Sequence, residues 1–256
     1  MTIPENRRNG LFKQCKRYVD LYLGDNNSNM QTNGEFRLMK YFLPKCDVVF
    51  DVGANIGLWT KIALDINKNL KLHAFEPSKP TFENLLKNQL PDNVKCNNIA
   101  LSSKKGKAKL YIFENISSLN SMYYRKGLES FGLKSQEKEE IIQMETLDNY
   151  CKENNIKYID FLKIDVEGHE LEVFKGAKNF LKNGNIKIIQ FEYGGCNIDS
   201  RILLMDIFTF ISDFNYNFYK IYPNRIKHIE RYDQKLENFA YQNWLLIRKK
   251  HKIPES

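Results

Sequence analysis

The cysteines of this 256-residue chain form no recognisable pattern. The five stand at positions 15, 46, 96, 151 and 196, so their number is odd and no C-x-x-C pair occurs. Disulfide frameworks and structural zinc sites both require paired, regularly spaced cysteines. The sequence therefore argues against both and favours a reducing compartment.

Long apolar runs are missing as well. No stretch approaches the roughly eighteen apolar residues of a membrane-spanning helix, and the first residues contain no apolar segment of the signal-peptide type. Internal repeats and a clear second domain are also not visible. We expect one globular domain in the cytoplasm, with residues 1–47 as an N-terminal helical cap and residues 48–256 as its main body.

Basic residues outnumber acidic ones. The chain has 39 Lys and Arg and 31 Asp and Glu, which gives a net charge of +8. Such a surface suits an anionic partner, whether nucleic acid, a nucleotide sugar, an acidic glycan or a membrane surface. A solvated lysine surface is the simpler explanation. The length and the hydrophobic content of 42% suffice for a full core.

One stretch, residues 48–57, organises the rest of the chain. An apolar run ends in Asp51 and enters a turn that contains Gly53 and Gly57, and helical spacing of apolar residues follows at 58, 62 and 66. This strand, turn and helix is typical of the opening of a nucleotide-binding βαβ unit. Glycine lets the backbone turn sharply and approach a ligand, and the helix N-terminus offers free N–H groups.

The next apolar run, residues 70–77, ends in Phe75 and Glu76, about twenty residues after the first glycine of the turn. A carboxylate at this position can accept hydrogen bonds from both ribose hydroxyls of a bound nucleoside. The glycine turn and the acid together therefore predict a nucleoside site.

The charges of the turn distinguish between nucleosides. A dinucleotide fingerprint reads G-x-G-x-x-G, but Asn55 occupies the middle glycine position here. Asp51 would repel a phosphate, whereas it suits a cationic ammonium group. S-adenosylmethionine (SAM) carries an ammonium and a sulfonium and no phosphate, so the pattern favours SAM over NAD.

Periodicity predicts the remaining elements. We expect helices over residues 11–23, 35–43, 58–65, 80–88, 147–154, 170–181 and 201–214. Strands are expected over residues 48–51, 71–76, 94–100, 107–113, 140–144, 159–165, 186–191, 218–222 and 244–248. Residues 115–138 are the least regular part and are either a substrate loop or a solvent-facing insertion.

Carboxylates recur where the predicted strands end. Asp51, Glu76, Asp165 and Glu192 all take such positions, as does Ala100. Ligands of an open parallel sheet lie beyond the carboxyl ends of its strands. We therefore expect these residues to converge on one site.

Four segments resemble the FkbM-type SAM-dependent methyltransferases: residues 51–57, 75–77, 98–102 and 162–177. The resemblance covers roughly residues 35–194. It implies an α/β fold of the class I methyltransferase (Rossmann-like) type, with a mostly parallel sheet, an antiparallel C-terminal hairpin and helices on both faces. It also implies O-methylation, often of sugar hydroxyls on glycans or natural products.

The resemblance adds detail to the expected cofactor site. It implies that the backbone around Ile99 and Ala100 faces the adenine, and that a helix before the first strand covers one side of the cofactor. Glu35, on that helix, is expected to be an exposed acid, with contact to the methionine end of SAM as the alternative. The expected cofactor-binding residues are Asp51, Gly53, Asn55, Gly57, Phe75, Glu76, Ile99, Ala100 and Asp165.

Methyl transfer to a hydroxyl needs an aligned acceptor and a group that takes its proton. Asp165 is the first candidate for this base, since it ends the strand nearest the expected methyl group. His169 is the second, because histidine titrates near working pH, with a structural role as the alternative. Glu192 is the third candidate, for acceptor binding or proton uptake.

Several alternatives stay open. Asp165, Glu192 and a third oxygen could hold Mg²⁺, but no characteristic ligand spacing appears and we expect no metal. An RNA-directed methyltransferase of the cap-ribose type fits the charge, although no RRM signature is present. A SAM-binding interaction protein without catalysis is the third. The leading hypothesis is a SAM-dependent O-methyltransferase that acts on a sugar or glycan acceptor.

Overall fold

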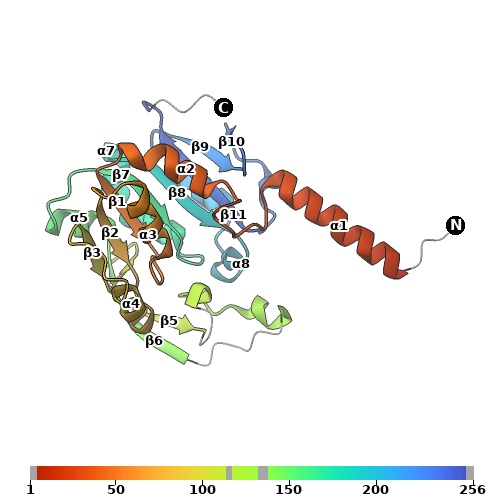
Figure 1. The fold of residues 1–256 in the computed structure, drawn as a ribbon, viewed down its shortest axis with the longest axis horizontal. Coiled ribbons are helices and arrows are strands. Elements are labelled where there is room, and N and C mark those ends of the chain that lie inside the picture. The colour runs from red at the N-terminus through yellow and green to blue at the C-terminus, as the bar shows by residue number, and fades with distance from the viewer. Residues whose placement is uncertain (1–4, 114–116, 132–137, 252–256) are drawn as a thin grey trace.

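The computed structural model describes residues 5–113, 117–131 and 138–251. Its body is an eight-stranded sheet with the strand order β10-β9-β11-β8-β7-β1-β2-β3 (Figure 1). The strands are β1 (Val48–Val52), β2 (Lys71–Phe75), β3 (Val94–Asn97), β7 (Ile159–Ile164), β8 (Ile186–Tyr193), β9 (Tyr216–Ile221), β10 (Ile226–Ile229) and β11 (Gln242–Arg248).

The first five of these strands run parallel, and β11 is antiparallel to both β8 and β9. This arrangement confirms the expected class I methyltransferase sheet. The antiparallel pairing of the last two expected strands is also confirmed. However, the chain between them forms β10, which pairs with β9 and was not expected. Its centre carries the exposed residues Lys227 and His228, so it lacks an apolar signal.

A second, three-stranded sheet lies beside the first, in the order β4-β6-β5. It contains β4 (Ala100–Leu101), β5 (Gly106–Ile112) and β6 (Lys138–Glu145). The continuous strand expected over residues 94–100 is therefore wrong. The Asn98 side chain donates hydrogen bonds to the carbonyl oxygens of Glu76 and Pro77, at 2.9 Å each. It thereby holds the chain where it leaves β3, and β4 pairs with β6 instead.

The helices are α1 (Glu5–Leu23), α2 (Glu35–Phe42), α3 (Leu58–Ile66), α4 (Lys79–Leu86), α5 (Leu147–Glu153), α6 (Glu170–Gly176), α7 (Lys178–Asn183), α8 (Cys196–Ser200) and α9 (Leu204–Ser212). The single helix expected over 170–181 is divided at Ala177, whose backbone is not helical. The helix expected from residue 201 begins at Leu204, and the short α8 was not expected. Among the described helices, none combines the length and the apolar character needed to cross a membrane.

Apolar side chains alternate between the two faces of the main sheet, as the two-residue period of a strand requires. Phe50, Leu162 and Trp244 face a core that includes residues of α5, α6, α7 and α9. Val49 and Phe161 face the opposite core, to which α2 and α3 contribute. Helices therefore cover both faces, as expected, and the carboxyl ends of the parallel strands meet at one edge.

Candidate active site

A cavity of about 1080 Å³ opens at this edge of the sheet. That volume suits a ligand the size of a nucleoside with an amino-acid tail. Of the expected site residues, the cavity is lined by Gly53, Asn55, Phe75, Glu76, Ile99, Ala100, Asp165, His169 and Glu192. Asp51 and Gly57 are not among the lining residues.

The turn after β1 fits tightly between two neighbouring strands. The N–H groups of Gly53 and Ala54 donate to the Phe75 carbonyl oxygen, at 3.0 and 2.9 Å. Gly53 has a positive φ of 81°, and a Cβ there would lie 1.8 Å from the backbone oxygen of Asp165. Only glycine fits this close approach. Gly57 also has a positive φ, but a Cβ there would meet Leu85 of α4, so its glycine serves packing.

Glu76 closes the turn from the next strand. Its carboxylate accepts hydrogen bonds from the backbone N–H groups of Asn55, at 3.0 Å, and Ser78, at 2.9 Å. The side chain is buried, and burial raises its pKa to about 7. Each carboxylate oxygen retains a second lone pair, so Glu76 can still accept ribose hydroxyls from the cavity side.

A buried lysine connects the turn with the end of β7. Lys163 Nζ lies 3.2 Å from Asp51 Oδ1 and 3.2 Å from Asp165 Oδ2, and it donates to the Gly53 carbonyl oxygen at 3.1 Å. Asp51 is fully buried, and its other oxygen accepts from Thr60 Oγ1 at 2.7 Å. Asp51 therefore faces Lys163, and not the cavity where direct contact with an ammonium was expected.

Lys163 was not among the expected site residues. Burial alone would lower the pKa of Lys163, but Asp165, Asp51 and Glu35 together raise it above its usual value. The signal in the sequence was a lysine between two apolar residues, Leu162 and Ile164, in a strand expected to be buried. Such a lysine requires buried counter-charges, and this requirement could have singled it out.

Replacing Lys163 tests this charge arrangement. We expect Lys163→Met to lower the free energy of unfolding by about 3–5 kcal/mol, because Asp51 is left buried without its cation. The double variant Lys163→Met/Asp51→Asn removes both charges and should recover much of the loss. Denaturant unfolding measures both values. A single variant as stable as the unmodified protein would contradict the arrangement.

Asp165 and Glu192 form a carboxyl pair at the ends of β7 and β8. Glu192 is 8% exposed, and a hydrogen bond joins its carboxyl to that of Asp165. Burial raises the pKa of Glu192 well above its usual value, and the neighbouring charges of Asp165, Glu167 and Glu170 raise it further. The Lys163 ammonium balances Asp165, so the proton of the pair belongs on Glu192.

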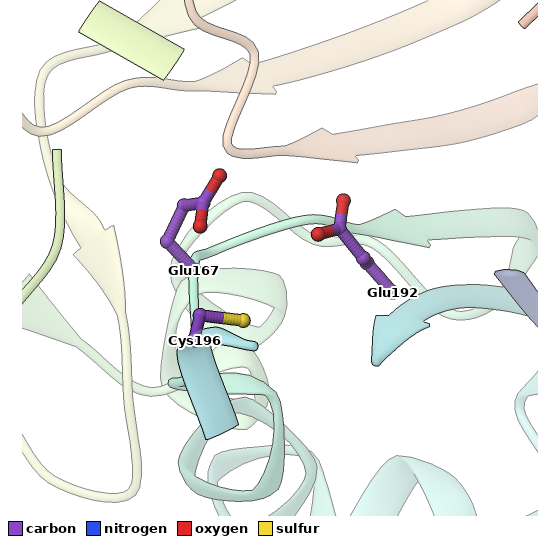
Figure 2. A group of neighbouring side chains, drawn as sticks. All are labelled: Glu167, Glu192 and Cys196. Carbon is purple, nitrogen blue, oxygen red and sulfur yellow. The ribbon is translucent and has the colours of Figure 1, made fainter. Parts of the chain in front are cut away.

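Glu167, Glu192 and Cys196 place potential metal-ligand atoms within 4.8 Å of one another (Figure 2). However, Arg125 Nη1 already pairs with Glu167 Oε2 at 2.7 Å. Burial raises the pKa of the Cys196 thiol well above its usual value. A metal ion would therefore have to displace both the guanidinium and the thiol proton. The chemistry of this donor set fits a divalent ion poorly.

His169 lines the cavity but has both ring nitrogens engaged. Nε2 is 3.0 Å from Ser102 Oγ, and Nδ1 is 3.0 Å from Tyr123 Oη. Burial lowers the pKa of His169 to about 4, so the ring is neutral near pH 7. It connects Ser102, directly after β4, with Tyr123 of the segment 117–131, a geometry that favours the structural alternative over a free base.

Hydrogen bonds and an ion pair connect the described part of the irregular segment, residues 117–131, to this site. Ser121 Oγ donates to the Glu167 carbonyl oxygen at 2.8 Å, and Arg125 pairs with the Glu167 side chain. Ser118, Leu119 and Asn120 also line the cavity. Residues 114–116 and 132–137 of the segment lie outside the described residues. The contacts favour the substrate-loop hypothesis for the part that is described.

Glu35 and Tyr241 complete the lining from elements far away in sequence. Glu35 is buried, so the expectation of an exposed helix acid is wrong. It accepts from Gln190 Nε2 at 2.6 Å, and burial raises its pKa. Tyr241 Oη accepts from Asn243 Nδ2 at 3.2 Å. The lining position of Glu35 agrees with the alternative stated from the sequence, contact with the cofactor. No local pattern could have identified Tyr241, because it reaches the site through the tertiary fold.

Glu170 makes the folding stability of the protein depend on pH. This fully buried acid accepts from the N–H groups of Val166 and Gly168, and burial raises its pKa to about 7 from the usual 4.5. The folded state thus binds the proton more tightly than the unfolded state. The resulting stability is complete below pH 4.5 and is lost as pH rises through about 7.

We expect the free energy of unfolding to fall by on the order of 3 kcal/mol over this window through Glu170. The variant Glu170→Gln should flatten the fall by a similar amount. Denaturant unfolding between pH 5 and pH 8 measures the two slopes. Equal slopes in the two proteins would show that Glu170 does not titrate in this range.

An open, mostly parallel sheet with a glycine turn and acids at its strand ends defines a cofactor site of the class I methyltransferase type. The family model for the methyltransferase FkbM domain matches residues 51–218, more than half of the chain. The chain therefore belongs to the FkbM methyltransferase family.

Three curated relatives are similar to this chain. The hexuronic acid methyltransferase AglP of Haloferax volcanii is 32% identical over 150 residues, which cover 58% of this chain and 57% of the relative. The methyltransferase sdnD of Sordaria araneosa is 28% identical, covering 64% of this chain and 74% of the relative. The 31-O-demethyl-FK506 methyltransferase FkbM of Streptomyces tacrolimicus is 28% identical, with coverage of 52% and 60%. The match to AglP spans a little more than half of that relative's length.

Proposed function

We propose that this protein is a SAM-dependent O-methyltransferase that acts on a hydroxyl of a sugar or glycan. The observation that carries the proposal is the shared cavity of Glu76 and Asp165. Glu76 is a buried carboxylate placed for a ribose, and Asp165 is a carboxylate held against Lys163. A nucleoside-binding acid and a candidate base thus face one space.

The charge of the lining supports SAM as the cofactor. Its acids are Glu35, Glu76, Asp165, Glu167 and Glu192, and its cations are Lys163 and Arg125. An excess of carboxylates suits a ligand with an ammonium and a sulfonium, and it opposes the phosphates of NAD. When bound, SAM supplies an activated methyl group. The residues for its nucleoside would be Gly53, Asn55, Phe75, Glu76, Ile99 and Ala100.

The carboxyl pair supplies the proton chemistry. Asp165 can accept the proton of an acceptor hydroxyl as its oxygen attacks. Glu192, which carries the proton of the pair, can donate a hydrogen bond and so orient the acceptor or Asp165 itself. Both side chains stand on strand ends, which fix their positions better than a mobile loop does, and positioning accounts for much of methyl-transfer catalysis.

The sugar acceptor is inferred from the relative that is named as a hexuronic acid methyltransferase. RNA is the less favoured acceptor, since a polyanion would approach a lining with more acids than cations. We propose the cytoplasm as the compartment of the reaction. All five cysteines are free thiols, as a reducing compartment would leave them.

Transfer of labelled methyl groups tests this proposal. The protein would be incubated with methyl-labelled SAM and either the glycan and nucleotide-sugar fraction or the RNA fraction of a cell extract. We expect label in the sugar fraction, and none there with Asp165→Asn. Label in RNA alone would show that the acceptor is RNA and not a sugar. Label in neither fraction would contradict the proposal.

A further inference from the structure

Helix α1 stands apart from the rest of the molecule (Figure 1). Every residue from 9 to 19 is exposed, so this part of the helix has no side that the body covers. Isolated helices of this length are marginal in water, because most helical stability comes from packing of an apolar face. A surface that covers α1 would therefore supply what the chain itself does not.

One side of α1 is apolar. The apolar stripe consists of Leu11, Phe12, Tyr18, Val19 and Tyr22, which are 53%, 68%, 72%, 49% and 65% exposed. At about 100° per residue they fall within roughly 120° of the helix circumference. Cys15, also exposed, lies in the middle of this arc.

The side opposite the apolar stripe is cationic. Between residues 9 and 23 the charged residues are Lys13, Lys16 and Arg17, with Asp20 as the one acid. Lys16 Nζ already pairs with Asp20 at 3.0 Å, which leaves Lys13 and Arg17 as excess positive charge. A helix with aromatic and aliphatic residues on one side and lysine or arginine on the other has the composition of an interfacial helix.

We propose that α1 binds the surface of an anionic lipid bilayer, with the apolar stripe in the headgroup region. Phe12, Tyr18 and Tyr22 are rings of the kind that favour the boundary between water and acyl chains. Lys13 and Arg17, on the other side of the helix, then lie on its water side near the anionic headgroups, whose surface potential attracts them. The catalytic domain would thereby be held at a membrane.

The same features fit a second copy of the chain less well. A helical dimer seam is built from aliphatic residues at heptad spacing. In α1 the positions with that spacing are Leu11, Cys15, Tyr18 and Tyr22, of which one is aliphatic.

Vesicle flotation of the full chain tests the proposal, with phosphatidylcholine vesicles that do or do not contain phosphatidylglycerol. We expect binding to the anionic vesicles only, and a decrease as salt screens the charges. Tyr18→Asp should reduce the bound fraction roughly tenfold or more, because it places a charge in the apolar stripe. The matched control is Leu21→Asp, which makes the same charge change about 120° away from the middle of the stripe.

The thermal unfolding midpoint should be the same in both variants, since the side chains of 18 and 21 contact solvent. Equal loss of binding in both would attribute the effect to net charge alone and overturn the orientation. Absence of binding to anionic vesicles would overturn the proposal. A concentration-dependent dimer that Tyr18→Asp disrupts would assign the stripe to a second copy.

Discussion

Asp165→Asn is expected to lower methyl transfer by about 10²–10⁴-fold, the range that a positioned general base contributes. The asparagine keeps the shape of the side chain and can still approach Lys163, but it cannot take up a proton. Asp165 is the more exposed member of the carboxyl pair, with 36% of its side chain exposed. The substitution therefore removes little buried contact. The SAM dissociation constant should change far less than kcat.

Glu192→Gln is the matched control for this variant. Glu192 already carries a proton, and glutamine retains a hydrogen-bond donor towards Asp165. We expect kcat to fall much less in Glu192→Gln than in Asp165→Asn, in the same steady-state assay. A larger fall in kcat for Glu192→Gln would assign the base to Glu192. Small and equal falls would show that neither carboxyl acts as a base and that catalysis depends on alignment alone.

Glu76→Ala is expected to weaken SAM binding by roughly 10²-fold or more. Two ribose hydroxyls that donate to a charged acceptor contribute about 1.5–3 kcal/mol each. The substitution also releases the N–H groups of Asn55 and Ser78, and so loosens the turn. Equilibrium titration with SAM measures the loss. An unchanged dissociation constant would contradict the ribose role of Glu76.

The pH dependence of SAM binding separates the direct effect of the Glu76 charge from its effect on the conformation of the turn. Because its pKa is about 7, Glu76 is increasingly protonated as pH falls below that value, and SAM affinity should fall with it. Glu76→Gln should bind SAM weakly with no such dependence between pH 6 and pH 8. If both proteins keep the same pH dependence, another group is responsible for it.

The cofactor half of the site could be predicted from the sequence because its signals are local. The turn that contains Gly53 and Asn55 follows an apolar strand, and Glu76 and Asp165 end two more. In a parallel sheet such positions converge without further information. The direction of a side chain depends on partners elsewhere in the chain, and therefore the pairing of Asp51 with Lys163 could not be predicted.

The partners of the supporting residues could not be predicted in this way. Lys163 and Glu35 are buried at the site only because the fold brings their counter-charges and hydrogen-bond partners to them. Arg125 comes from a segment with no periodicity, and its position depends on Glu167, 42 residues further along. His169 was selected for its usual pKa, which the burial of the ring shifts out of the working range.

The most direct test of the account is the ligand that the cavity selects. Equilibrium titration of the full chain with SAM, and in parallel with NAD, measures this without an acceptor. We predict one SAM bound per chain, and no binding of NAD at the same concentration. Binding of NAD without SAM would contradict the account, because the acids of the lining would then face phosphates.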